Sequence, residues 1–219
     1  MLFGVGLQLL LSRFSSGWSI GKGHLVQTPI ADSFSEFGIF FTSPDFSQWT
    51  NPAVFDLGIC DIFSVRVAGN VIGTNSLGSL EYAVIVAGAK LVLVMGHTRC
   101  GAISSSVKFL DQRNDTQQTS GRPHLHAIVS EIQESVEGNE CRGVATMHPD
   151  AMEECVDRIA KKNVQRTVRE IVNRSHTVRS AIDAGELLVV GAMCDVKTGV
   201  IDFFVSDSVR IESQQELVS

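Results

Sequence analysis

The sequence predicts an α/β protein. Its central, mainly parallel β-sheet is flanked by helices, with an N-terminal arm and a C-terminal β-hairpin. Short apolar runs typical of buried strands lie at 37–42, 90–95 and 187–192. Helical patterns separate them, and a strand–helix–strand order implies right-handed crossovers between parallel strands. A turn at 195–199 followed by the apolar segment 200–205 predicts the closing hairpin.

The N-terminal half of the domain contains two further predicted elements. Residues 61–67 alternate and are rich in β-branched side chains, which predicts a strand, and 68–70 predict a turn. Residues 76–89 predict a helix that ends at Gly88, from the apolar positions Leu77, Leu80, Val84 and Val86.

The C-terminal half is predicted to be largely helical before its last two strands. Residues 111–123 are polar and predict a loop, and 125–136 predict a helix. A longer helical pattern covers 150–184 and predicts one continuous helix that Gly185 ends.

Length and composition are those of one folded domain with extensions. The 219 residues are 44% hydrophobic and 19% charged, which favours a globular chain. We divide it into an arm (1–36), a domain (37–207) and a polar tail (208–219). The apolar segment 1–11 is shorter than the roughly 20 residues that span a bilayer, and it could instead pack on a partner subunit. We therefore expect no membrane span.

Charge and cysteine usage narrow the function classes. The net charge of −6 comes without a basic block, so we expect no binding to nucleic acid or anionic lipid. The five cysteines are odd in number, irregularly spaced and without a CxxC motif. This pattern argues against a disulfide framework and favours buried, reduced thiols in a cytoplasmic protein.

The strongest chemical signal follows the strand at 90–95. His97 and Cys100, separated by two residues in a turn, carry the imidazole and thiolate groups that zinc prefers. Gly96 and Gly101 let the chain turn tightly around them. The alternative is a loop histidine beside a half-buried cysteine.

The motifs around His97 and Cys100 favour the zinc-ligand interpretation. Five segments resemble β-class carbonic anhydrases: 55–70, 77–84, 96–102, 188–192 and 197–199. The resemblance implies that zinc is bound by two cysteines and one histidine, with water or an aspartate in the fourth position. It implies reversible hydration of carbon dioxide to bicarbonate and a proton, and a homodimer or higher homo-oligomer with its site at a subunit interface.

The sequence departs from that family at the first zinc-ligand motif, Cys-x-Asp-Ser-Arg. Ser43 stands in the cysteine position and Asp45 matches the aspartate. Ser47, or Gln48 if one residue is inserted, stands in the arginine position. A serine hydroxyl is neutral at pH 7 and a poor zinc ligand. The resemblance leaves a reduced site of His97, Cys100 and Asp45.

The roles that this resemblance implies are specific. Asp45 would orient hydroxide, accept a proton, or coordinate zinc directly and so block the water. Val67 and Phe63 would line an apolar pocket for carbon dioxide. We also keep the alternative of a metal-poor, catalytically impaired homologue that acts as a structural or binding subunit. A rescue role is not expected for Cys60, Cys194 is expected to be a buried thiol, and no ligand role is expected for the remaining histidines His24, His124, His126, His148 and His176.

Overall fold

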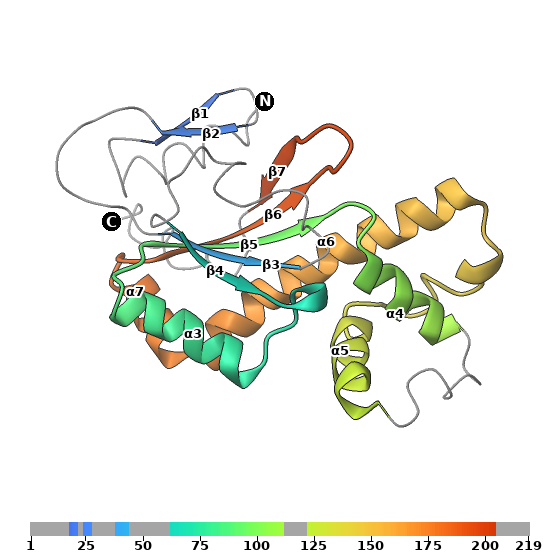
Figure 1. Cartoon of the computed structure of the whole chain (residues 1–219), viewed down its shortest axis with the longest axis horizontal. Helices are drawn as coiled ribbons and strands as arrows, with labels where there is room; N and C mark the ends of the chain where they lie inside the picture. Colours follow the sequence, from blue (N-terminus) through green and yellow to red (C-terminus); the bar gives the residue numbers. More distant parts are fainter. Residues whose placement is uncertain (1–17, 22–23, 28–37, 44–61, 112–121, 205–219) are drawn as a thin grey trace, which may run out of the picture.

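The computed structural model describes residues 18–21, 24–27, 38–43, 62–111 and 122–204. Within them, a five-stranded sheet has the order β4-β3-β5-β6-β7, and Figure 1 shows helices gathered below it. The strands are β3 (Gly38–Thr42), β4 (Ile62–Arg66), β5 (Leu91–His97), β6 (Leu188–Cys194) and β7 (Ile201–Phe204). The helices are α3 (Thr74–Ile85), α4 (Gly101–Asp111), α5 (Pro123–Gln133), α6 (Pro149–Arg174) and α7 (His176–Asp183), with short 3-10 turns η2 (Ala68–Asn70) and η3 (Val144–Thr146).

The sheet is parallel except at its last strand. β3 pairs in parallel with β4 and with β5, and β5 pairs in parallel with β6. β7 returns antiparallel to β6. This confirms the predicted fold class, including the C-terminal hairpin. Because the carboxyl ends of parallel strands lie at one edge of a sheet, the segments that follow β3, β4 and β5 are brought together there.

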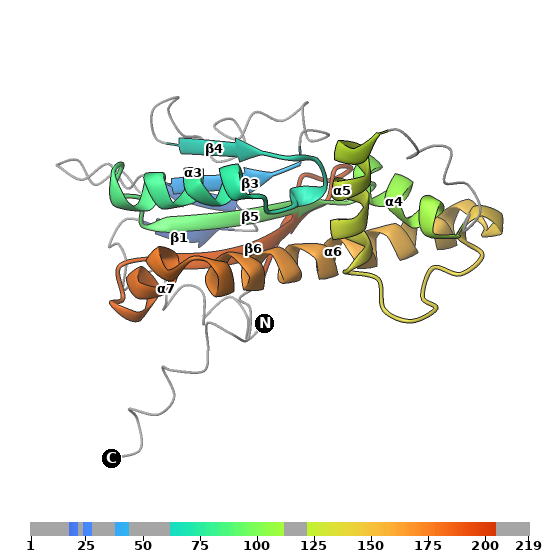
Figure 2. The same cartoon turned by 90° about the horizontal axis from the view of Figure 1, so that it is seen from below.

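Helices α3, α6 and α7 cover one face of the sheet, while α4 and α5 lie beyond the carboxyl ends of the parallel strands (Figures 1 and 2). α6 packs on β5 and β6, with apolar residues at helical spacing buried along it. Gly96 is needed for this close packing, since a Cβ there would lie 2.6 Å from Val164 Cγ2. Among the described residues, no helix is long and apolar enough to cross a bilayer.

The predicted single helix over 150–184 is wrong, because the chain forms two helices there. Ser175 has extended backbone angles (φ −109°, ψ 109°) between α6 and α7. Its hydroxyl accepts a hydrogen bond from the Val178 N–H at 3.1 Å, which caps α7. The helical spacing of the apolar residues continues across the break, so periodicity alone did not reveal it.

Helix α4 and the strands β1 (Trp18–Gly21) and β2 (His24–Gln27) were not predicted. Helix α4 starts at Gly101 and contains three consecutive serines, which obscure its apolar positions Ile103 and Val107. Within the expected irregular arm, β1 and β2 pair antiparallel. The predicted features at 1–11 and 208–219, and most of the loop at 111–123, lie outside the described residues.

Candidate metal centre

Three buried residues lie where β3 and β5 end. Ser43 directly follows β3, His97 is the last residue of β5, and Cys100 precedes α4. All three are at most 4% exposed. The Cys100 Sγ lies 4.0 Å from the Ser43 Oγ. The structure thus brings the predicted ligand Cys100 next to the residue in the position of the missing cysteine, and it places His97 at the same end of the sheet.

The His97 ring is fixed in one tautomer by its own turn. Its Nδ1 lies 2.9 Å from the Thr98 carbonyl oxygen. A carbonyl can only accept, so the neutral ring carries its proton on Nδ1 and its lone pair on Nε2. A backbone carbonyl in this position is what commonly orients a metal-binding histidine.

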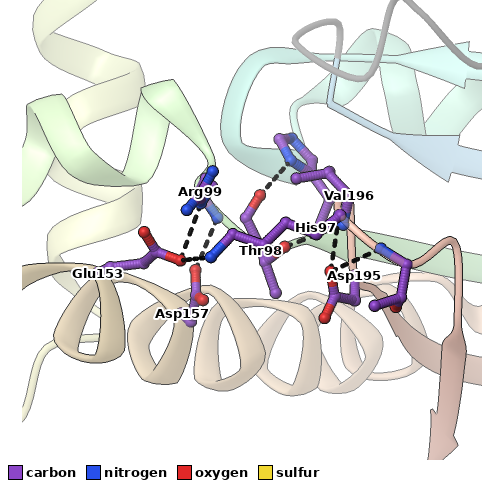
Figure 3. A network of polar contacts seen from close by, with 9 residues as sticks. His97, Thr98, Arg99, Glu153, Asp157, Asp195 and Val196 are labelled. Atoms are coloured by element: carbon purple, nitrogen blue, oxygen red, sulfur yellow. Dashed lines mark hydrogen bonds and ion pairs between the residues drawn. The ribbon is translucent and has the colours of Figure 1, made fainter. Parts of the chain in front are cut away.

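The turn between the two ligands is held by α6 (Figure 3). Arg99 has a left-handed backbone, with φ 59°, and its N–H donates to Asp157 Oδ1 at 2.7 Å. Its side-chain Nε lies 2.8 Å from Glu153 Oε1. Lys197, from the C-terminal hairpin, reaches the same Glu153 oxygen at 3.0 Å. The turn is therefore anchored through both its backbone and its side chain.

The hairpin between β6 and β7 supports the turn from its other side. The Thr98 N–H donates to the Cys194 carbonyl at 2.9 Å, and the Val196 N–H donates to Thr98 Oγ1 at 3.0 Å (Figure 3). Asp195 Oδ1 accepts the N–H groups of Lys197 and Thr198. The predicted 195–199 turn thus supports the ligand turn directly.

The two α6 carboxylates have opposite electrostatic environments. Hydrogen bonds from Arg99 and Lys197 lower the pKa of Glu153 to about 2. Burial raises the pKa of Asp157, although the Arg99 N–H partly opposes this. Asp157 therefore anchors the turn at the cost of burying its charge.

Ser43 is held by a separate network. Its Oγ accepts the Gly69 N–H at 3.3 Å. Gly69 has φ +66°, and a Cβ there would overlap Ile132, so only glycine suits the position. Asn163 Nδ2 on α6 donates to the Gly69 carbonyl at 2.6 Å. Asn70 Nδ2 donates to the Met95 carbonyl at 2.8 Å. The η2 turn is thereby tied both to α6 and to β5.

The spacing of Cys100 and Ser43 matches that of two zinc ligands, but the donor set does not complete a zinc site. Two sulfurs bound tetrahedrally at about 2.3 Å from zinc lie ~3.8 Å apart, close to the 4.0 Å that joins Cys100 Sγ and Ser43 Oγ. Position 43 nevertheless offers a neutral hydroxyl. Among the described residues, no group of three or more His, Cys, Asp or Glu side chains could hold a metal. His97 and Cys100 fit two zinc ligands, and Ser43 does not fit the third.

Cys194 does not supply the missing thiolate. It is aligned with His97 in the β5–β6 ladder, but its Sγ lies 3.9 Å from the Asp195 carbonyl. Burial raises its pKa to about 11. The expected buried thiol agrees with these observations.

The remaining candidate residues are dispersed or lie outside the described segments. Val67 follows β4 at the carboxyl edge, where its N–H donates to the Thr42 carbonyl. Phe63 lies four residues earlier, roughly 13 Å away along an extended strand, with its ring centroid 6.4 Å from that of Tyr82. Their pocket role stays a prediction. Outside the described residues are Asp45, Ser47, Gln48 and Cys60, whereas His24 is the first residue of β2.

The histidines at or near helix starts are exposed. They are His124, His126, His148 and His176. Sequence reasoning missed the supporting residues Glu153, Asp157 and Asn163. The one available signal was the four-residue spacing of the two carboxylates, which places them on one face of a helix, and it does not indicate what they face.

The chain is thus an α/β protein with a histidine–cysteine turn at the carboxyl edge of its parallel sheet, and comparisons with known proteins identify its family. A family model described as carbonic anhydrase matches residues 47–201, which include His97 and Cys100 and begin beyond Ser43. The chain is 32% identical over 146 residues to carbonic anhydrase 2 of Mycobacterium tuberculosis, covering 67% of this chain and 64% of that protein. The chain belongs to the β-class carbonic anhydrase family, and it spans just under two thirds of the length of that relative.

Solved structures agree on the fold. The β-carbonic anhydrase CafA of Aspergillus fumigatus superposes with a TM-score of 0.64 at 21% identity, covering 78% of each chain. A β-carbonic anhydrase of Sordaria macrospora, described as tetrameric, superposes with a TM-score of 0.62 at 20% identity, covering 78% of this chain and 82% of that one. At these identities the likeness establishes the architecture alone.

Proposed function

We propose that the chain catalyses the reversible hydration of carbon dioxide to bicarbonate and a proton, with zinc bound more weakly than a complete ligand set would bind it. The observation that carries this proposal is the 4.0 Å between Ser43 Oγ and the Sγ of Cys100, which lies three residues beyond the buried His97. Family membership supports zinc as the cofactor. Asp45, two residues beyond Ser43, is the proposed third ligand.

The residues of this chain contribute orientation and charge. The Thr98 carbonyl fixes the Nδ1 proton of His97, which leaves Nε2 to act as a ligand. Cys100 stands at the N-terminal end of α4, where the partial positive charge of the helix favours a thiolate. The Gly69 N–H donates to the side-chain atom at position 43, and there it could equally stabilise a thiolate.

The proposed active form is a homodimer or higher homo-oligomer in the cytoplasm. The tetrameric Sordaria protein supports assembly, as does an exposed apolar surface on and just after α3. There Tyr82, Ile85 and Val86 are 56%, 68% and 62% exposed. Exposed apolar residues that lie together, unlike single ones, are typical of an interaction surface. Light scattering of the purified chain tests this part of the proposal.

A second candidate is a metal-poor homologue that acts as a structural or binding subunit. The observation that favours it is Ser43, because its hydroxyl removes a charged, soft ligand from a buried position. The hydrogen bonds and ion pairs around the 97–100 turn would then stabilise the fold rather than orient metal ligands.

Stopped-flow hydration of carbon dioxide, combined with the zinc content of the same sample, separates the two candidates. The hydratase proposal expects a rate above buffer that is lost with a chelator and in Cys100→Ser. The rate should be retained in Cys194→Ser, which removes a buried thiol outside the site. Zinc well below one per chain and a rate equal to buffer at saturating zinc would favour the metal-poor subunit.

A further inference from the structure

Two further cysteines lie outside the candidate metal centre and close to each other. Cys141 is in the turn before η3 and Cys155 is in the second turn of α6. Their Sγ atoms are 2.8 Å apart, and both residues are buried, at 3% and 2% exposure. A disulfide bond is about 2.05 Å long, so the two sulfurs need to approach by less than ~1 Å to form one.

We propose that Cys141 and Cys155 form an intramolecular disulfide under oxidising conditions. The pair lacks the further ligands of a metal site, since the described residues hold no group of three metal-binding side chains. The proposal is independent of zinc binding and of hydratase activity.

The disulfide would join two segments that are already in contact. Cys155 Sγ also lies 3.7 Å from the Glu140 carbonyl oxygen. Lys162 Nζ, further along α6, contacts Glu140 Oε1 at 2.7 Å and Glu137 Oε2 at 2.9 Å. The segment just before Cys141 is therefore held against α6 through Glu137 and Glu140. A covalent bond would fix an arrangement that the native fold already makes.

The burial of the pair determines when the bond can form. Burial raises the pKa of Cys141 to about 12, so little thiolate is present in the folded chain at neutral pH. We therefore expect the bond to form while the chain folds or when this turn opens, and to resist reduction once it is enclosed.

The chemistry is two successive thiol–disulfide exchanges with a low-molecular-weight disulfide such as oxidised glutathione. One protein thiolate attacks the small disulfide and releases one small thiolate. The second protein thiolate then displaces the other small thiolate from the mixed disulfide. The two protein thiols lose two protons and two electrons, and the small disulfide is reduced to two thiols.

The test refolds the full-length, fully reduced chain in a glutathione redox buffer, which gives the oxidant access to both thiols. The sample is then acid-quenched, alkylated and digested with trypsin. Cleavage after Arg113, Arg142 and Arg158, with Arg122 protected by Pro123, places the two cysteines on separate peptides, 114–142 and 143–158. We expect these peptides to be joined, and free thiols to fall from five to three.

The cross-linked chain should also unfold at a higher temperature. Closing a loop of this length raises the melting temperature of a chain of this size by roughly 5 °C or more. Cys155→Ser should abolish the linked peptides and the shift, and Cys194→Ser should keep both. The proposal is overturned if the refolded wild type retains two alkylated, unlinked cysteines at 141 and 155 while oxidised glutathione is in excess. Glutathione adducts on the two separate peptides would overturn it equally.

Discussion

The two halves of the candidate metal centre differ in the ligands that they offer. In the His97–Cys100 turn both ligands are present, with a fixed histidine tautomer and anchors from α6 and the C-terminal hairpin. At the end of β3, the Gly69 N–H still points at the ligand position, but Ser43 occupies it. Supporting contacts from described residues are thus present around both positions, and at position 43 the difference from a cysteine ligand is oxygen in place of sulfur.

This difference shows that the hydrogen bonds around a ligand position can be present when the ligand itself is not. The network that holds Ser43 consists of backbone groups and α6 side chains that also maintain the fold, since Asn163 binds both the Gly69 carbonyl and the Ser135 hydroxyl. Such groups stabilise the fold whether or not a metal is bound. Predictions on this support follow, from the largest expected effect on stability to the smallest.

Gly69→Ala should disrupt the support of the Ser43 half. The new Cβ would overlap Ile132, and the backbone would keep its positive φ of +66°. Overpacking of about 1–3 kcal/mol and a left-handed backbone cost of about 1–2 kcal/mol predict a loss of roughly 2–5 kcal/mol in the free energy of unfolding, measured by urea denaturation.

The matched control is Gly78→Ala, in α3, where a Cβ has no neighbour within 4 Å. It should leave stability unchanged or raise it by up to ~1 kcal/mol, because alanine has the higher helix propensity. Equal losses in the two variants would contradict the role assigned to Gly69.

Asp157→Ala should disrupt the support of the His97–Cys100 half. It leaves the Arg99 N–H without its carboxylate acceptor at 2.7 Å, which predicts a loss of about 1–2 kcal/mol. Asp157→Asn keeps an acceptor oxygen and removes a partly buried charge, so it should cost less. Urea denaturation of both variants checks this, and an asparagine variant as unstable as the alanine variant would show that the hydrogen bond is not the relevant interaction.

Glu153→Gln should have the smallest effect, visible only in acid. The folded-state pKa of Glu153 is lowered from 4.5 to about 2. Its contribution is therefore present above about pH 4.5 and is lost as the pH falls towards 2. Stability measured at pH 5 and at pH 3 should differ less in Glu153→Gln than in wild type.

The control for this measurement is Glu154→Gln, which changes the neighbouring, exposed carboxylate of α6. It should keep the pH dependence of the wild type. An unchanged pH dependence in Glu153→Gln would contradict the ion pairs with Arg99 and Lys197.

The sequence was sufficient to predict the five-stranded sheet and the histidine–cysteine turn, because both depend on local patterns. Buried parallel strands are continuous apolar runs, and residues 91–95 and 188–192 show them without interruption. His97 and Cys100 are three residues apart and follow directly from β5, so their proximity needs no tertiary information.

The supporting contacts could not be predicted because they join distant parts of the chain. Asp157 meets the Arg99 N–H across 58 positions, and Asn163 meets Gly69 across 94. The break at Ser175 depends on a capping hydroxyl within an otherwise helical pattern. The proximity of Cys141 to Cys155 likewise depends on how the turn before η3 packs on α6.

The most direct test of the account is the zinc affinity of the wild type and of Ser43→Cys, measured by competition with a chromogenic chelator. Ser79→Cys, on α3, controls for adding a thiol elsewhere. The account predicts that Ser43→Cys binds zinc more than about 100-fold tighter than the wild type, a larger effect than the 10–100-fold of outer-shell changes, and that Ser79→Cys does not. Equal affinities of the wild type and Ser43→Cys would contradict the conclusion that Ser43 occupies the position of a missing zinc ligand.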